Sequence, residues 1–67
     1  MAKAQSWGVR IRKARLERGM AAEDLARKAK VARTTIYGIE SGARQPRPST
    51  LRKLLRALES TPKLPEI

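Results

Sequence analysis

The sequence predicts an all-α protein of four helices, on three observations. The segment from Ala22 to Gly42 reads as two short helices joined by a tight turn, and the rest of the chain is arranged around it. Leucines at positions 51, 54, 55 and 58 follow the i, i+3, i+4, i+7 spacing of one helical face. Glycine and proline separate these segments.

The chain is short and strongly basic, and both properties limit what it can be. Its 67 residues make one domain with a marginal core, and no cysteine is present to cross-link it. Lysine and arginine number 16 against 6 acidic residues, a net charge of +10. This excess favours a polyanionic partner, nucleic acid first and an anionic membrane second.

Several classes of protein are not expected from this composition. The chain has no long apolar run and no hydrophobic signal core, so we expect a cytoplasmic, nucleoid-associated protein without a membrane span. It contains no histidine or cysteine, and its six acidic residues show no paired catalytic spacing. We therefore expect no enzymatic activity, no cofactor and no metal.

The first helix is expected over residues 7–18, after a flexible polar arm at residues 1–6. Ser6 is a plausible N-cap for this helix. Its apolar positions are Trp7, Ile11 and Ala14, and its other surface carries Arg10, Arg12, Lys13 and Arg18. We interpret Trp7 as a lid over the core, because aromatic residues at helical spacing usually pack inside. Gly8 is unfavourable in a helix but tolerable near its start.

The second and third helices are expected over residues 23–29 and 34–40. Val31 lies between them and can plug the corner where they meet. Neither Ala21 nor Ala32 offers a capping hydroxyl, an absence that costs about 1 kcal/mol relative to serine or threonine.

The connections on either side of the third helix contain glycine, proline and one lysine. Lys30 stands in a turn where glycine would relax the backbone most easily. Gly42 closes the third helix as its C′ residue. Pro46 and Pro48 prevent that helix from continuing, and Pro48 suits the first position of a fourth helix over residues 48–58. Residues 60–67 form an irregular tail.

The most specific pattern in the chain is a set of three segments. They are IRKARLERGM, AEDLARKAKVARTTIYGIESGARQP and STLRKLLRAL, with EDLA, V-x-R-T-T-I and I-E-S-G followed by proline as their strongest parts. Through them, residues 11–58 resemble the lambda-repressor-like, or Xre-type, helix-turn-helix family. The resemblance implies a compact lambda-repressor-like bundle of four or five helices, with a helix-turn-helix, that binds DNA.

The resemblance also assigns base contacts. The recognition helix would run from Arg33 to Glu40 and lie in the major groove, with its N-terminal end toward the bases. Arg33 is the best candidate for direct readout, because a guanidinium group can pair with guanine O6 and N7. Gly38 either permits a closer approach to DNA or is neutral. The expected base contacts are Arg33, Thr34, Tyr37 and Gly38.

Phosphate contacts are expected from helix ends and from the loop after the third helix. Ala22 stands where the family commonly has a glutamine that binds phosphate, so that side-chain contact is absent. The expected phosphate contacts are Ala22, Thr35, Ser41, Arg44 and Arg47. For Arg52 and Arg56 a solvated face pointing away from DNA is an equally open interpretation.

Two further expectations follow from the resemblance. Arg15 and Glu40 match positions where the family joins the first helix to the recognition helix through an ion pair. Family members that dimerise through this domain often use a fifth helix, which TPKLPEI replaces here. The apolar residues left for a dimer contact are Leu58, Leu64 and Ile67.

The leading functional interpretation is a sequence-specific, double-stranded DNA-binding transcriptional regulator, a repressor that acts as a homodimer. The alternative is a DNA-binding antitoxin or accessory module that docks a protein partner through its C-terminal tail. A basic peptide acting on membranes or RNA is disfavoured, because a membrane-surface helix should be longer and carry larger apolar residues.

Overall fold

The computed structural model describes residues 6–65, which form four helices and no strand. They are α1 (Trp7–Glu17), α2 (Ala22–Ala29), α3 (Arg33–Glu40) and α4 (Pro48–Glu59). The predicted all-α bundle is confirmed, and no fifth helix follows α4 within the described residues. Residues 1–5 of the predicted arm, and Ile67, lie outside those residues.

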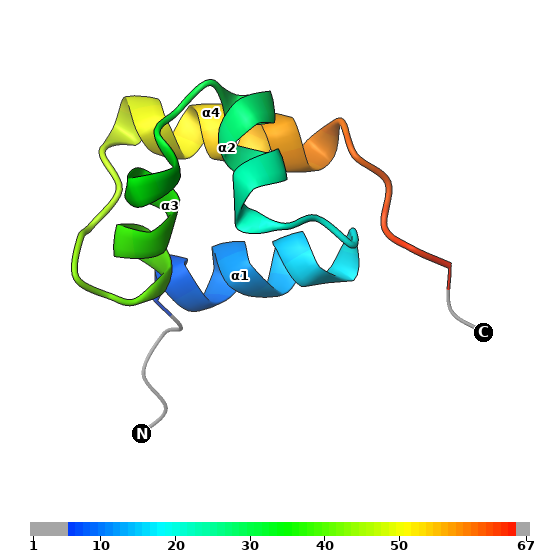
Figure 1. The fold of residues 1–67 in the computed structure, drawn as a ribbon, viewed down its shortest axis with the longest axis horizontal. Coiled ribbons are helices and arrows are strands. Elements are labelled where there is room, and N and C mark those ends of the chain that lie inside the picture. Colours follow the sequence, from blue (N-terminus) through cyan, green and yellow to red (C-terminus); the bar gives the residue numbers. More distant parts are fainter. Residues whose placement is uncertain (1–5, 66–67) are drawn as a thin grey trace.

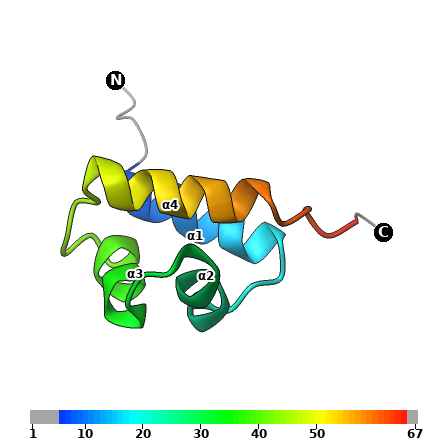
Figure 2. The ribbon, with the colours of Figure 1, turned by 90° about the horizontal axis from the view of Figure 1, so that it is seen from above.

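The four helices surround one small core. In Figure 1, α1 and α4 run along opposite edges of the molecule, and Figure 2 shows α2 and α3 together on one side of this pair. Every helix contributes to the fully buried side chains, which are Ile11, Leu25, Ile36, Ile39 and Leu54. Val31 is half-buried against them, as the sequence predicts for a corner plug. No helix in residues 6–65 is long and apolar enough to cross a membrane.

The helix starts use few hydroxyl caps. The Ser6 hydroxyl accepts a hydrogen bond from the Val9 backbone N–H at 3.3 Å, as predicted for an N-cap. At α2 the chain uses a different group, because the Ala21 N–H donates to a carboxylate oxygen of Asp24 at 3.0 Å. The aspartate therefore satisfies one of the orphan donors that a capping residue leaves at a helix start.

Lys30 ends α2 in the left-handed backbone region, with φ 59° and ψ 45°. A side chain in this region costs about 1–2 kcal/mol relative to a right-handed conformation, and glycine avoids that cost. The sequence predicted that glycine would relax this turn most easily, and the chain nevertheless carries lysine.

Gly8 brings α1 into direct contact with α3. A Cβ atom built on Gly8 would collide with the carbonyl oxygen of Ile39 and lie 3.2 Å from the Glu40 Cα atom. The glycine is buried and its lack of a side chain sets the helix spacing, so its description as merely tolerable was wrong. The same spacing explains Trp7, because the core-facing line of α1 runs through Gly8 and Ile11. Trp7 is half-buried outside the core cluster, beneath the Arg10 guanidinium at 5.0 Å, and is not a core lid.

Arg18 joins the ends of α1 and α4. Its Nε donates to the carbonyl oxygens of Leu58 at 2.8 Å and Thr61 at 2.9 Å. Carbonyl groups at a helix C-terminus lack hydrogen-bond donors within the helix, and the Arg18 guanidinium supplies a donor to them. The expectation that Arg18 lines the outer surface was wrong, because the carbonyl groups that it binds belong to residues about forty positions away in the sequence.

The tail after α4 lies against the end of α1. The Leu64 N–H donates to the Glu17 carbonyl oxygen at 2.9 Å, and the Leu64 side chain covers Gly19. Leu58 is only 3% exposed and belongs to the core, so it is not available for the dimer contact predicted for it. Leu64 remains 59% exposed despite its contact with Gly19.

The close approach at Gly8 is testable by stability measurements. Gly8→Ala should lower the free energy of unfolding by about 1–3 kcal/mol, the usual cost of overpacking, because the added methyl group meets backbone atoms that cannot rotate away. Urea unfolding followed by circular dichroism measures this change. Lys13→Ala, on the exposed side of the same helix, should alter it by less than about 0.5 kcal/mol. Unchanged stability of Gly8→Ala would contradict the helix contact.

Candidate nucleic-acid interface

The outer face of α3 carries the side chains predicted to contact bases. Ile36 and Ile39 anchor the helix in the core, which turns Arg33, Thr34 and Tyr37 outward. Tyr37 is 51% exposed. The structure therefore places these three side chains together on one accessible surface of a short, well-anchored helix.

Arg33 is held by a carboxylate of the preceding helix. Its Nη1 lies 2.9 Å from Oε1 of Glu23, and both side chains are more than half exposed. An ion pair at such exposure contributes about 0–1 kcal/mol. Arg33 can therefore leave Glu23 at little cost, and Glu23 is a residue of this surface that the sequence interpretation missed.

Gly38 is covered by Arg44. A Cβ atom on Gly38 would lie 3.0 Å from the Cδ atom and 3.3 Å from the Cγ atom of Arg44. The Arg44 N–H also donates to the Gly38 carbonyl oxygen at 3.0 Å. Neither sequence interpretation of Gly38 described this arrangement, in which the missing side chain leaves room for the arginine stem.

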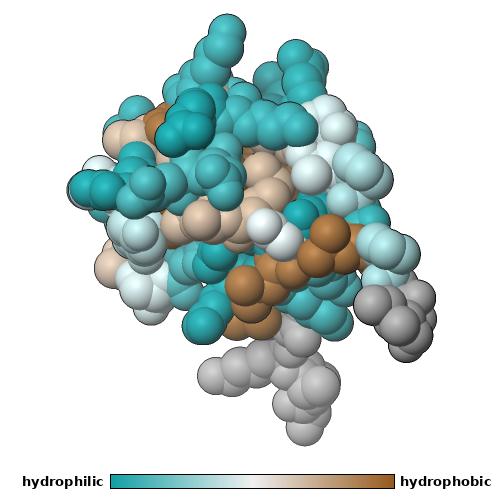
Figure 3. Space-filling view, turned by 45° about the vertical axis from the view of Figure 1, so that its right-hand side comes forward, coloured by the Kyte–Doolittle hydropathy of each residue, from teal (hydrophilic) through white to brown (hydrophobic). Residues whose placement is uncertain are grey.

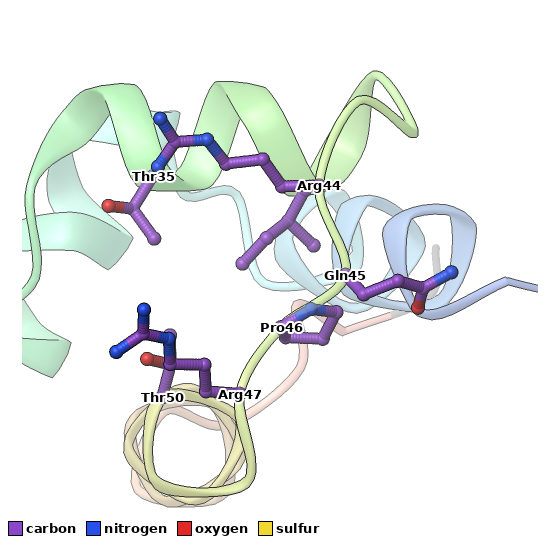
Figure 4. A pocket seen from close by; sticks show the side chains of 7 residues that line it. Thr35, Arg44, Gln45, Pro46, Arg47 and Thr50 are labelled. Carbon is purple, nitrogen blue, oxygen red and sulfur yellow. The ribbon is translucent and has the colours of Figure 1, made fainter.

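A basic hollow of about 600 Å³ lies between α3 and the start of α4, and we refer to it as the α3–α4 hollow. Figure 4 shows the Arg44 side chain running along α3 toward Thr35, with Arg47 and Thr50 on the opposite wall and Gln45 pointing away. The residues lining it are Thr35, Ile39, Arg44, Gln45, Pro46, Arg47 and Thr50, with no acidic residue among them. Guanidinium and hydroxyl groups in this arrangement suit a phosphate.

The other two predicted phosphate contacts have different surroundings. Ser41 is exposed at the end of α3, and its hydroxyl donates to the Gly38 carbonyl oxygen at 3.1 Å. Ala22 is 7% exposed and its methyl group packs in the core, which leaves its backbone N–H as the only group available to a phosphate. Thr50, which the sequence interpretation missed, follows Pro48 in the first turn of α4, a position typical of anion binding.

Arg15 fixes α3 against α1. Its Nε and Nη2 donate to the two carboxylate oxygens of Glu40 at 2.9 Å each, and its Nη1 donates to the Met20 carbonyl oxygen at 2.8 Å. The side chains retain only 12% and 10% exposure. Hydrogen bonding to Glu40 raises the pKa of Arg15 above its usual range, against the opposing effect of burial. The pair sets the orientation of α3 from the side that packs against α1.

A family model described as helix-turn-helix matches residues 11–64. The chain belongs to this helix-turn-helix family. The matched residues include the lambda-repressor-like, Xre-type pattern. This helix-turn-helix protein is therefore a DNA-binding regulator of transcription.

Solved structures give a second comparison. The wild-type restriction-modification controller protein C.Esp1396I is 42% identical to this helix-turn-helix protein, with a TM-score of 0.75. The alignment covers 78% of this chain and 68% of that one. A substituted form of the same controller protein is 40% identical over 78% of this chain and 69% of its own, also with a TM-score of 0.75. No curated protein matches the chain.

The Arg15–Glu40 pair is testable by a double-mutant cycle. Glu40→Ala should lower the free energy of unfolding by about 3 kcal/mol, because it leaves the Arg15 guanidinium largely buried and without its carboxylate. Glu59→Ala, at the exposed end of α4, is the control and should have little effect. Arg15→Ala and the double variant Arg15→Ala with Glu40→Ala complete the cycle. The double variant should lose less than the sum of the two single losses, because it leaves neither charge unpaired. Strictly additive losses in that cycle would show that the two residues are not coupled.

Proposed function

We propose that this helix-turn-helix protein is a sequence-specific, double-stranded DNA-binding repressor that reads the major groove with α3. The observation that carries the proposal is the exposed face of α3, where Arg33, Thr34 and Tyr37 lie together beside an acid-free basic hollow. An α-helix fits the major groove, and its N-terminal residues are the ones placed to reach base edges.

Arg33 is the proposed main base contact. In this proposal it exchanges the Glu23 carboxylate for guanine O6 and N7, which accept from a guanidinium group in a bidentate manner. Thr34 contacts a base edge or a thymine methyl group, and Tyr37 contacts a base or phosphate in the next turn. Glu23 pairs with the guanidinium in the absence of DNA.

The α3–α4 hollow is the proposed phosphate site. Arg44 and Arg47 supply charge, and Thr35 and Thr50 supply hydroxyl groups from opposite walls. Ser41 and the Ala22 N–H are proposed as additional contacts at the ends of α3 and α2. Contacts of this kind fix the register of a protein on the duplex without reading sequence.

Repression, a dimeric state and location complete the proposal. A domain that occupies a duplex excludes other proteins from the same base pairs, which is the simplest way for a small DNA-binding protein to repress. A homodimer would read two half-sites about one helical turn apart. The proposed location is the cytoplasm, at the nucleoid. Similarity to a restriction-modification controller protein supports a role in transcriptional control.

A second candidate is a DNA-binding antitoxin or accessory module that docks a protein partner. Figure 3 shows a hydrophobic band on one face of the molecule, and the exposed large aliphatic residues of the described chain are Val9, Leu16 and Leu64. Exposed apolar patches can mark protein contacts. Strong duplex binding only in the presence of such a partner, with none by the chain alone, would favour this candidate.

The experiment that tests the proposal is selection of bound duplexes from a random pool with the full chain. A palindrome with half-sites about one turn apart is the expected result and would establish a specific, dimeric regulator. A single short site would support sequence reading by a monomer and reject the dimer. No enrichment at low salt would reject sequence-specific binding.

Replacing Arg33 should affect specificity more than overall affinity. Arg33→Ala should lose about 1–3 kcal/mol of discrimination at one base pair of the selected site. Glu23→Gln should instead strengthen duplex binding, because it releases Arg33 and removes a negative charge. Both effects are measurable by titrating the selected duplex and its single-base variants. Unaltered discrimination by Arg33→Ala would remove this residue from base readout.

Gly38→Ala should weaken DNA binding without lowering the stability of the fold. The added methyl group displaces the Arg44 stem, which is flexible, while helix propensity improves by roughly 1 kcal/mol. We expect unchanged or higher thermal stability together with weaker binding to all duplexes. The salt slope should fall by about one unit, as for Arg44→Ala. If Gly38→Ala binds like the original chain, the position of Arg44 over α3 does not matter for DNA.

A further inference from the structure

A second basic surface lies on α2 and α4, outside the α3 face and the α3–α4 hollow. It is a groove of about 760 Å³ between the C-terminal end of α2 and the length of α4, and we refer to it as the α2–α4 groove. The cations lining it are Lys28, Lys30, Arg52, Lys53 and Arg56, and no acidic residue lines it. Figures 1 and 2 show α2 packed beside α4 along this side of the molecule.

Four of the five acidic residues of the described chain are engaged elsewhere, and the fifth, Glu59, lies exposed at the end of α4, three residues after Arg56. Glu17, Glu23 and Glu40 form ion pairs with arginine or lysine residues outside the groove, and Asp24 caps the start of α2. Within residues 6–65, no ion pair reaches any of the five groove cations. Like charges collected in one groove repel one another, and an anion of matching extent bound there would relieve that repulsion.

Lys30 provides an independent observation. It holds the left-handed backbone position at the end of α2, where glycine would be relaxed. A lysine is therefore present at a position where the backbone favours another residue, and its side chain lines the groove. The local structure does not require this ammonium group, which is placed to contact an anion bound in the groove.

The groove adjoins the proposed phosphate site. Arg47 and Thr50 line the α3–α4 hollow, while Ser49 and Arg52 line the α2–α4 groove, so both begin at the first turn of α4. With Arg44 and Arg47, the cations extend from the edge of α3 along α4. A duplex backbone, with regularly spaced phosphates, matches an extended track of cations better than a single small anion does.

We propose that the α2–α4 groove is a second DNA-backbone surface, which binds duplex phosphates beyond those contacted from the α3 face. The phosphates come either from the flank of the same duplex or from a second duplex. The proposal rests on DNA binding by this protein but not on its reading of sequence. It also assigns Arg52 and Arg56 to DNA binding, rather than to a solvated face that points away from DNA.

The test compares two variants of equal charge. The groove variant carries Arg52→Gln, Lys53→Gln and Arg56→Gln, and the control carries Arg12→Gln, Lys13→Gln and Lys63→Gln on α1 and the tail. All six side chains are exposed, and circular dichroism with thermal unfolding checks that both variants fold. Each is titrated with a short duplex, and with the same duplex extended by about 10 bp, one helical turn, on each side.

The two sources of phosphate give different results. If the flank of the same duplex binds, the original chain should prefer the extended duplex. The groove variant should then lose at least about tenfold in affinity for that duplex, lower its salt slope by about two to three units, and bind the short duplex as before. If a second duplex binds, the original chain and the control should carry a labelled duplex onto an immobilised one, whereas the groove variant should not.

A single substitution separates folding from binding. Lys30→Gly removes one groove cation and relaxes the left-handed turn. It should keep or raise the thermal midpoint while weakening binding to the extended duplex or capture of the second duplex. Unaltered DNA binding by Lys30→Gly would overturn the part assigned to this residue.

Three results would overturn the proposal as a whole. One is indistinguishable DNA binding by the groove variant and the control. Another is an original chain that shows neither a preference for extended duplexes nor capture of a second duplex. The third is loss of RNA binding by the groove variant with DNA binding unchanged. All arms can use duplexes of random sequence, and the control variant shows how much of any preference comes from the larger number of sites on the longer duplex. The test therefore remains valid even if Arg33 does not read bases.

Discussion

The Arg15–Glu40 pair is the interaction on which the rest of the structure depends. One guanidinium group satisfies both carboxylate oxygens of Glu40 and the Met20 carbonyl oxygen, and so joins α1, the end of α3 and the loop before α2. Gly8 lets the backbones of α1 and α3 approach closely at the same place. A planar guanidinium group has a fixed geometry, so the pair orients α3 as well as holding it.

Acidic residues are scarce, and the fold uses most of them for structural tasks. Glu40 supports α3, Asp24 caps α2, and Glu17 lies near Arg18 and Lys63. Glu23 instead engages Arg33, a residue of the proposed base-reading face. The remaining arginine and lysine side chains therefore stay available to an external anion, which links the packing of the domain to its charge.

Sequence predicted the parts of this structure that depend on local pattern. The four helices, the leucine stripe of α4 and the plug at Val31 follow from spacing and from glycine and proline positions. Partners for Arg15 came from a family resemblance. Gly8, Trp7 and Arg18 were misinterpreted because their surroundings come from α3, α4 and the tail. Glu23, Thr50 and the Arg44 stem over Gly38 likewise depend on tertiary contacts that helical periodicity does not report.

The contacts of Arg18 and Leu64 have a consequence for synthesis of the chain. The partners of Arg18 are Leu58 and Thr61, and Leu64 bonds to Glu17, so each contact spans at least 40 residues. A nascent chain cannot complete the end of α1 until its own tail has left the ribosome. Contacts of such separation favour one cooperative folding event, in which the end of α1 completes its contacts only after Leu64 has left the ribosome.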